Sequence, residues 1–258
     1  MEFVHKVSKG ARYNQIYIPK EAKKYFEAGD VVKVKLLKKR INLYYSKNLK
    51  KLSKFKEDII KEIFSLLSST KEIKQILIFG SFLSKKYDYN DIDIMIISEK
   101  TSEKELYNLL SKRLDVKLHI ITISQNKLEE LIKICPLTKS MLHYYISNKK
   151  FENEFIISNG WVINKKHISF LLMMPEDLLE LNLNGKIYYD CIRRLVLIER
   201  FLVNKVLDPL KINGEVEDLI GKDFSTLLYK NEQIPDNEIA RLKKIIKDKL
   251  KVIKKMLK

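Results

Sequence analysis

The sequence predicts an α+β multidomain protein built from three parts in chain order. We expect a small N-terminal β-barrel-like domain over residues 1–47, a central mixed-sheet α/β domain over 48–135 and a helical domain over 136–258. Short segments of alternating apolar and polar residues fill the first part. In the second part, apolar runs of strand length alternate with amphipathic segments. In the third part, most apolar residues recur at the spacing of an α-helix.

Composition narrows the class of protein. The chain has 258 residues, 45% of them hydrophobic, with seven Gly and five Pro, which is typical of a globular protein with a buried core. No apolar run has the roughly 18 to 20 residues that a membrane span needs, and the first residues lack the apolar core of a secretory signal. The two cysteines, Cys135 and Cys191, have no ligand-like spacing, which predicts reduced thiols and no zinc site. We expect a cytoplasmic protein that does not associate with membranes.

The net charge of +17 is concentrated at the two ends of the chain. Residues 1–56 hold 16 Lys and Arg against four acids, and residues 241–258 hold nine against one. Basic ends favour contact with nucleic acid, DNA or RNA, through the phosphate backbone. The alternative is a proteome-wide bias toward lysine, as in AT-rich or thermophilic organisms.

The N-terminal domain is expected to contain short strands at Phe3–Val7 and Gln15–Ile18 around a polar turn. Pro19 begins a short helix, because its fixed φ and missing N–H are tolerated there. "VVKVKLL" (31–37) alternates like a strand after the turn pair Gly29-Asp30, and "INLYYS" (41–46) adds a further strand. Because about 45 residues bury little surface alone, this domain is expected to dimerise or to pack on the rest of the chain.

This stretch resembles the AbrB-like swapped-hairpin family through "SKGARYNQIYIPKEAKKYF" followed by "GDVVKVKLL". The resemblance implies a homodimer in which two copies interleave hairpins into a barrel. It also implies DNA contact by basic residues, of which the candidates are Lys6, Lys9, Arg12 and Lys20. A barrel that only dimerises, with lysines that only solvate it, is the alternative.

The central domain begins with a core-facing helix in "EDIIKEIFSLLSS" (57–69), whose apolar residues form one stripe. Strands are then expected at 75–79, 91–97 and 116–123, with helices at 103–114 and 125–134.

Two short polar motifs interrupt these apolar strands. Asp91 and Asp93 lie two residues apart on a strand, so both carboxylates project from one face, where they repel each other unless a cation lies between them. Mg²⁺ (or Mn²⁺) prefers such oxygen ligands together with substrate phosphates. Gly80-Ser81 closes the preceding strand, where a phosphate can approach the backbone and Ser81 can donate hydrogen bonds. Lys85 and Lys86 either add positive charge to this site or are ordinary solvated lysines.

"FGS", nine residues and then "DID" resembles the minimal nucleotidyltransferases of the DNA polymerase β superfamily, over about residues 55–135. The resemblance implies transfer of a nucleoside monophosphate from a nucleoside triphosphate to a hydroxyl, with release of pyrophosphate. It implies that Asp91 and Asp93 hold Mg²⁺ and that Gly80 and Ser81 bind the triphosphate.

The family usually supplies a third carboxylate from the adjacent strand, and here that position falls on His119 in "DVKLHIITIS". Asp115 lies four residues earlier on the same face, about 13 Å away at the usual strand rise. Three interpretations stay open. His119 is a general base or ligand, Asp115 is the third acid in a shifted register, or the site binds a nucleotide and turns over poorly. The Arg-Gly that often follows Gly-Ser in this family is also missing.

The remaining chain predicts helices in "LTKSMLHYYISN" (137–148), after Asn184-Gly185, and at 236–258. They are expected to form a substrate-side or lid domain. The lysines of the last helix either solvate it or face a nucleic acid. Two functions follow for the whole chain: a Mg²⁺-dependent nucleotidyltransferase whose acceptor is a nucleic acid or a protein, or a DNA-binding regulator or antitoxin-like protein with a catalytically incomplete nucleotidyltransferase fold.

Overall fold

The structure is a computed structural model that describes residues 2–35, 40–84, 89, 91–154, 157, 160–181, 183–229 and 234–258. The chain divides into two compact units, residues 1–40 and 41–258.

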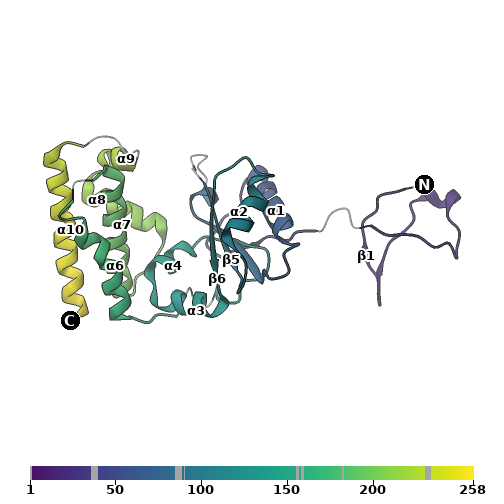
Figure 1. Ribbon diagram of the computed structural model, residues 1–258, viewed down its shortest axis with the longest axis horizontal. Helices are drawn as coiled ribbons and strands as arrows, with labels where there is room; N and C mark the ends of the chain where they lie inside the picture. Colours follow the sequence, from purple (N-terminus) through teal and green to yellow (C-terminus); the bar gives the residue numbers. More distant parts are fainter. Residues whose placement is uncertain are drawn as a thin grey trace. The chain divides into compact units, whose positions relative to one another are not determined.

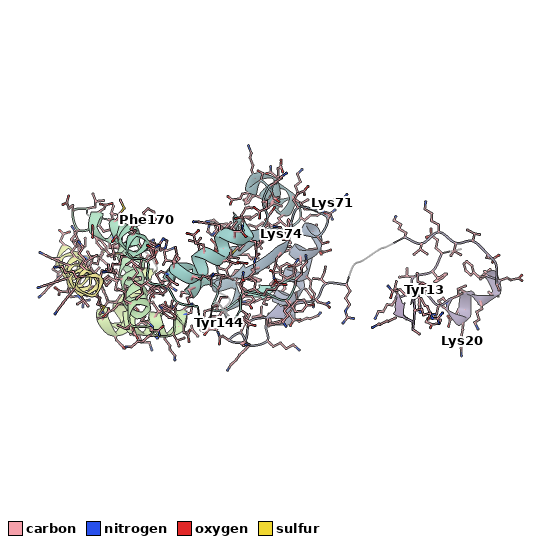
Figure 2. The ribbon with its side chains drawn as sticks, turned by 90° about the horizontal axis from the view of Figure 1, so that it is seen from below. Tyr13, Lys20, Lys71, Lys74, Tyr144 and Phe170 are labelled. Atoms are coloured by element: carbon pink, nitrogen blue, oxygen red, sulfur yellow. The ribbon has the colours of Figure 1, made fainter. Side chains whose placement is uncertain are left out.

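The first unit contains little regular structure. Strands β1 (Ser8–Lys9) and β2 (Asn14–Gln15) pair in antiparallel fashion, and the 3-10 helix η1 (Lys20–Tyr25) follows Pro19 as expected. Of the residues described in this unit, Ala22 alone is buried. Tyr13 and Lys20, labelled in Figure 2, are both exposed. The unit therefore has almost no core of its own.

The expected barrel is not present in this unit. A two-stranded sheet of four residues is the regular β structure described there, and no barrel closes within residues 2–35 and 40. The expected strands at Phe3–Val7 and Gln15–Ile18 are replaced by β1 and β2, and residues 31–35 form no strand; residues 36–39 lie outside the described part. The physical reason is that alternating residues form a strand only where a neighbouring strand accepts their hydrogen bonds.

The second unit contains a five-stranded mixed sheet in the order β3-β7-β4-β5-β6. Strands β5 and β6 are parallel, and the other pairs are antiparallel. An α+β architecture with a central mixed sheet is therefore confirmed. The elements from the start of this unit to its last strand are β3 (Tyr44–Tyr45), α1 (Lys54–Leu67), β4 (Gln75–Phe79), η2 (Ser81–Leu83), β5 (Ile92–Ile97), α2 (Glu103–Ser111), β6 (Leu118–Ile123), α3 (Gln125–Ile134), α4 (Pro136–Met141) and β7 (Ile146–Ser147).

Both faces of the central strands are covered. Alternate residues of β4 and β5, such as Ile76 and Ile94, pack with helices α1 and α2 on one face. The residues between them, such as Leu77 and Met95, pack with helix α3 and with Tyr145 on the other. This two-sided burial explains why these strands are almost continuously apolar. It leaves the polar residues at the strand ends as the exceptions.

Two short strands extend the sheet beyond the segments that the sequence assigned to it. Tyr44–Tyr45 falls before the expected boundary at residue 47, but it pairs with β7 in the central sheet. Ile146–Ser147 falls after the expected boundary at residue 135, and it pairs with β4 as well as with β3. Both are two-residue strands whose pairing partners are remote in sequence, so no local pattern marks them.

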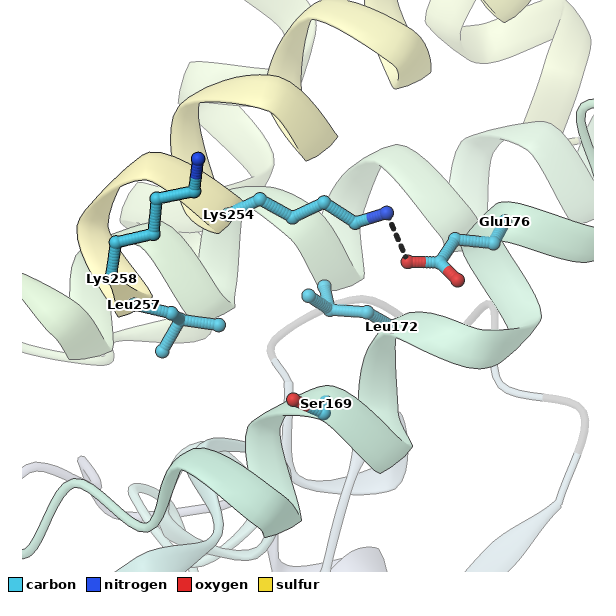
Figure 3. A pocket seen from close by; sticks show the side chains of 6 residues that line it. All are labelled: Ser169, Leu172, Glu176, Lys254, Leu257 and Lys258. Atoms are coloured by element: carbon cyan, nitrogen blue, oxygen red, sulfur yellow. Dashed lines mark ion pairs between the residues drawn. The ribbon is translucent and has the colours of Figure 1, made fainter.

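The chain after the sheet is helical, as expected. Helix α7 occupies the centre of this core and contacts α6, α8, α9 and α10, which Figure 1 shows gathered around it. A small cavity between α6 and α10 is bordered by the ion pair of Lys254 with Glu176 (Figure 3). No helix in the described ranges is both long enough and apolar enough to cross a bilayer. The helices are α6 (Lys165–Asp177), α7 (Gly185–Leu202), α8 (Pro209–Ile220), α9 (Lys222–Tyr229) and α10 (Asp236–Leu257).

Candidate active site

The Gly-Ser motif forms a tight turn at the end of β4. Gly80 has φ +81° and ψ −163°, a backbone conformation that only glycine adopts readily. The next residues form the 3-10 turn η2, in which the amide of Leu83 donates to the carbonyl of Gly80 and that of Ser84 to the carbonyl of Ser81. Gly80 and Ser81 are exposed, so a ligand can reach this turn.

Asp93 lies directly beside this turn. In the antiparallel register it stands opposite Phe79, the residue before Gly80. A Cβ added to Gly80 would lie only 2.0 Å from Oδ2 of Asp93. The missing side chain of Gly80 is therefore what lets the carboxylate approach the backbone of the turn.

His119 lies on the other side of Asp93 from Gly80, so residues from β4, β5 and β6 meet at this point. Parallel pairing of β5 with β6 sets His119 opposite Asp93, and His119 Nδ1 lies 2.9 Å from Asp93 Oδ1. An N–H at Nδ1 can donate to this carboxylate, which leaves Nε2 as the nitrogen able to accept a proton. The two oxygens of the Asp93 carboxylate therefore face different neighbours: Oδ2 lies next to Gly80, and Oδ1 contacts the imidazole of His119.

The electrostatics of Asp93 reflect this position. Its side chain is 21% exposed, whereas that of His119 is 59% exposed. Burial raises the pKa of the Asp93 carboxyl, the hydrogen bond with His119 opposes this shift, and the negative charge of Asp91 adds to it. Asp91 is partly buried just before β5. A partly buried carboxylate beside a second one favours a cation as partner.

The other candidates are not gathered at this point. Asp115 precedes β6, which begins at Leu118, and it is exposed. No hydrogen bond or ion pair joins Asp115 to Asp93 within the part of the chain that the structure describes. Lys85 and Lys86 lie outside the described residues.

The four basic candidates for nucleic-acid contact belong to the first unit. All four are exposed, and Lys9 is part of β1. The four residues are Lys6, Lys9, Arg12 and Lys20.

The described residues contain no group of three or more His, Cys, Asp or Glu side chains arranged to hold a metal ion. The two carboxylates with hard oxygen donors are those of Asp91 and Asp93, and the position next to them on β6 carries an imidazole. Two carboxylates and substrate phosphates form an adequate ligand set for Mg²⁺. The donor set therefore fits a divalent cation that binds together with a triphosphate.

Comparison with known families bears on this same region. Residues 61–168 match the family model described as Polymerase beta, Nucleotidyltransferase. The match supports a nucleotidyltransferase-superfamily domain in this part of the chain. It spans the turn at Gly80, both carboxylates, His119 and strand β7, and it supports nucleotidyl transfer as the general activity. No curated protein and no solved structure matches the chain.

The match does not reach the first unit, so the AbrB-like resemblance of that unit stays a prediction. Sequence reasoning also missed a residue that contacts the end of the Gly80–Ser84 turn. Lys56 on α1 is buried and donates a hydrogen bond to Ser84. Its position in the charged stretch "KFKED" at the start of α1 gave no signal, because a lysine in the first helical turn is usually solvated.

Proposed function

We propose that the chain is a nucleotidyltransferase that moves a nucleoside monophosphate from a nucleoside triphosphate to a hydroxyl acceptor, with Mg²⁺ (or Mn²⁺) as its cofactor. The observation that carries the proposal is the position of Asp93 between Gly80 on one side and His119 on the other. The family match over residues 61–168 supports the general chemistry.

In this proposal, Asp91 and Asp93 hold the metal ion and the turn at Gly80-Ser81 receives the triphosphate. Ser81 contributes a hydroxyl and an exposed backbone, and Gly80 lets phosphate oxygens approach without a Cβ in the way. When bound, Mg²⁺ supplies charge neutralisation on the phosphate oxygens.

His119 is the proposed general base. With Nδ1–H held by Asp93, its Nε2 can take the proton of the attacking hydroxyl. The hydroxyl oxygen forms a bond to the α-phosphorus, the bond from the α-phosphorus to the bridging oxygen breaks, and pyrophosphate leaves with that oxygen. Asp115 has no part in this scheme.

The test is a transfer assay with labelled nucleoside triphosphates, Mg²⁺ or Mn²⁺, and RNA, DNA and protein acceptors. Asp93→Asn keeps the shape of the side chain and removes its charge, so we expect transfer to fall by about 100-fold or more. His119→Ala should reduce transfer and change its pH profile. Asp115→Asn is the matched control and should retain activity; an Asp115→Asn variant as inactive as Asp93→Asn would contradict the proposed site.

We further propose that the acceptor is a nucleic acid. Helix α10 and the residue that follows it carry exposed lysines at intervals of three or four residues, at 244, 247, 251, 255 and 258, a line about 21 Å long at the helical rise. We call these five residues the lysine stripe. Among the residues described, no ion pair involves a lysine of this stripe.

The apolar side of α10 argues against a membrane as the partner. Leu242, Ile246, Leu250 and Ile253 are buried in the helical core, so this side of the helix is not free to enter a bilayer. Val252 and Met256 are the exposed large apolar side chains among the described residues of α10, and two such residues are too few to insert into a bilayer. A line of five exposed lysines fits a phosphate backbone better.

We propose that the first unit forms a homodimer. Its apolar side chains are strongly exposed, with Val31 99% exposed, Tyr13 79% and Val4 77%, which is unfavourable in an isolated unit. A double variant, Val32→Lys and Val34→Lys, adds charge at two exposed positions and should yield a monomer by light scattering. A wild-type protein that is already monomeric at micromolar concentration would contradict the dimer.

The second candidate is a DNA-binding regulator or antitoxin-like protein with an incomplete nucleotidyltransferase fold. The observation in its favour is the imidazole at the position next to the carboxylate pair. It predicts DNA binding that survives Asp93→Ala, with no transfer to any acceptor. Binding should then be lost when the basic residues of the first unit are replaced by Gln together, namely Lys6, Lys9, Arg12 and Lys20.

A further inference from the structure

Lys56 is an unusual residue for its place in the fold. It lies in the first turn of α1, three residues after the N-cap Ser53, where a lysine side chain would normally reach solvent. Instead it is 2% exposed, and burial lowers the pKa of its amine from the ordinary value. Burying an ammonium group is unfavourable unless polar or aromatic groups compensate it.

The compensating groups include atoms from both ends of the segment that joins β4 to β5. Lys56 Nζ donates to the carbonyl of Ser84 at 2.8 Å. The same Nζ lies 5.3 Å from the ring centroid of Phe82 and 5.1 Å from that of Tyr89, within the range of a cation–π interaction. The two rings meet edge to face at 4.9 Å.

These contacts tie α1 to the candidate site at two points. Ser84 closes the 3-10 turn that begins at Gly80, so the hydrogen bond from Lys56 holds the far end of that turn. Tyr89 stands two residues before Asp91 in the sequence, so the contact with its ring lies next to the carboxylate pair along the chain. One ammonium group therefore contacts the chain on both the Gly-Ser side and the Asp-x-Asp side of the site.

Packing alone does not require a cation here. A methionine has a similar length and fills a buried space without the desolvation penalty of an ammonium. What a methionine cannot supply is the charged hydrogen bond to the turn and the attraction to two ring faces.

We propose that Lys56 is a positioning residue for the nucleotide, which fixes the Gly80–Ser84 turn and the side chain of Tyr89 to helix α1 so that the two halves of the site keep a constant separation. This inference rests on the proposed nucleotidyltransferase function. Lys56 acts through the turn and through Tyr89, and it need not touch the nucleotide.

The test compares Lys56→Met with Lys54→Met. Lys54 lies on the same helix, but its side chain is 77% exposed and pairs with Asp58, four residues later. Nucleotide affinity is measured by calorimetry on the full chain with Mg²⁺ and a nucleoside triphosphate, and KM and kcat are measured separately by transfer. Loss of a charged hydrogen bond that supports binding should weaken nucleotide affinity and raise KM by about 10-fold in Lys56→Met, with kcat changed much less. Lys54→Met should match the wild type in both.

A second variant covers the case in which Lys56→Met fails to fold. Tyr89→Leu removes one ring from the ammonium and leaves the bond to Ser84, so about a 3-fold loss of affinity is expected. Hydrogen exchange over residues 80–84 provides a further measurement, and it should rise in both variants but not in Lys54→Met.

The outcomes separate the two proposals. If the wild type binds no nucleoside triphosphate, the proposed function fails and this inference fails with it. If the wild type binds and the folded Lys56→Met and Tyr89→Leu variants bind equally well, only the role of Lys56 is overturned. A fall in kcat with unchanged KM and unchanged affinity would also overturn it, since that pattern belongs to a group acting in the chemical step.

Discussion

Gly80→Ala tests the closest contact in the candidate site. Gly80 has φ +81°, and a Cβ added there would lie 2.0 Å from Asp93 Oδ2 and 2.9 Å from its Cγ. Real Cβ atoms do not approach other atoms so closely, so either the turn or Asp93 must move. Asp93 cannot move freely, because its other oxygen lies 2.9 Å from His119 Nδ1.

Two costs add up in this variant. A backbone conformation that L-residues rarely adopt costs on the order of 1–3 kcal/mol. Forcing an extra methyl group into occupied space typically costs about 1–3 kcal/mol more. We therefore expect Gly80→Ala to lower the free energy of unfolding by about 2–6 kcal/mol, and to weaken nucleotide binding because Asp93 is displaced.

Two other glycines separate these costs. Gly221 has φ +91° with nothing within 4 Å of an added Cβ, so Gly221→Ala carries the backbone strain without the collision. Gly214, inside α8, has neither a positive φ nor a neighbour within 4 Å. Gly214→Ala should therefore stabilise the chain by about 0.5–1 kcal/mol, the usual gain of Ala over Gly in a helix.

Urea unfolding of the three full-length variants, followed by circular dichroism, measures each change. The expected order of stability is Gly214→Ala, then wild type, then Gly221→Ala, then Gly80→Ala. If Gly80→Ala loses no more stability than Gly221→Ala and binds nucleotide like the wild type, then Asp93 does not lie against the turn and the proposed site is wrong.

Three further predictions concern other parts of the chain. Burial lowers the pKa of Lys139 to about 8, so as the pH rises the amine loses its proton in the native state before it does in the unfolded state. The free energy of unfolding should therefore rise between pH 8 and about 10.4, by at most roughly 1.4 kcal/mol per pH unit. Lys139→Met should abolish this rise, as measured by urea unfolding at each pH. Cys191 is fully buried and its thiol pKa is raised to about 12, so a thiol reagent at pH 8 should label it only in denaturant; labelling of the native protein at the rate of a free thiol would contradict its burial. Replacing Lys247, Lys251 and Lys255 by Gln should reduce the slope of log affinity for nucleic acid against log salt by about 2–3, because each phosphate contact contributes about 0.7–0.9; an unchanged slope would exclude the lysine stripe as the contact.

The secondary structure of the central domain could be predicted closely from its sequence. β4 matches the expected strand at 75–79, α3 matches the expected helix at 125–134, and β5 begins one residue after the expected strand. These segments are predictable because burial on both faces leaves long apolar runs with clear polar limits. The first unit is the opposite case, since its alternating residues had no neighbouring strands to pair with and most of its expected strands are missing.

Local residue patterns were sufficient to find the Gly-Ser turn and the Asp-x-Asp pair, because each motif is short and lies at the end of an apolar strand. They could not choose between His119 and Asp115, since that choice depends on the register of β6 against β5. They also gave no indication of the buried ammonium of Lys56 beside Ser84, or of the contact between Gly80 and Asp93. Motif spacing is a property of neighbouring residues, whereas register, burial and close approach depend on pairing between segments far apart in the chain, and only the tertiary structure decides them.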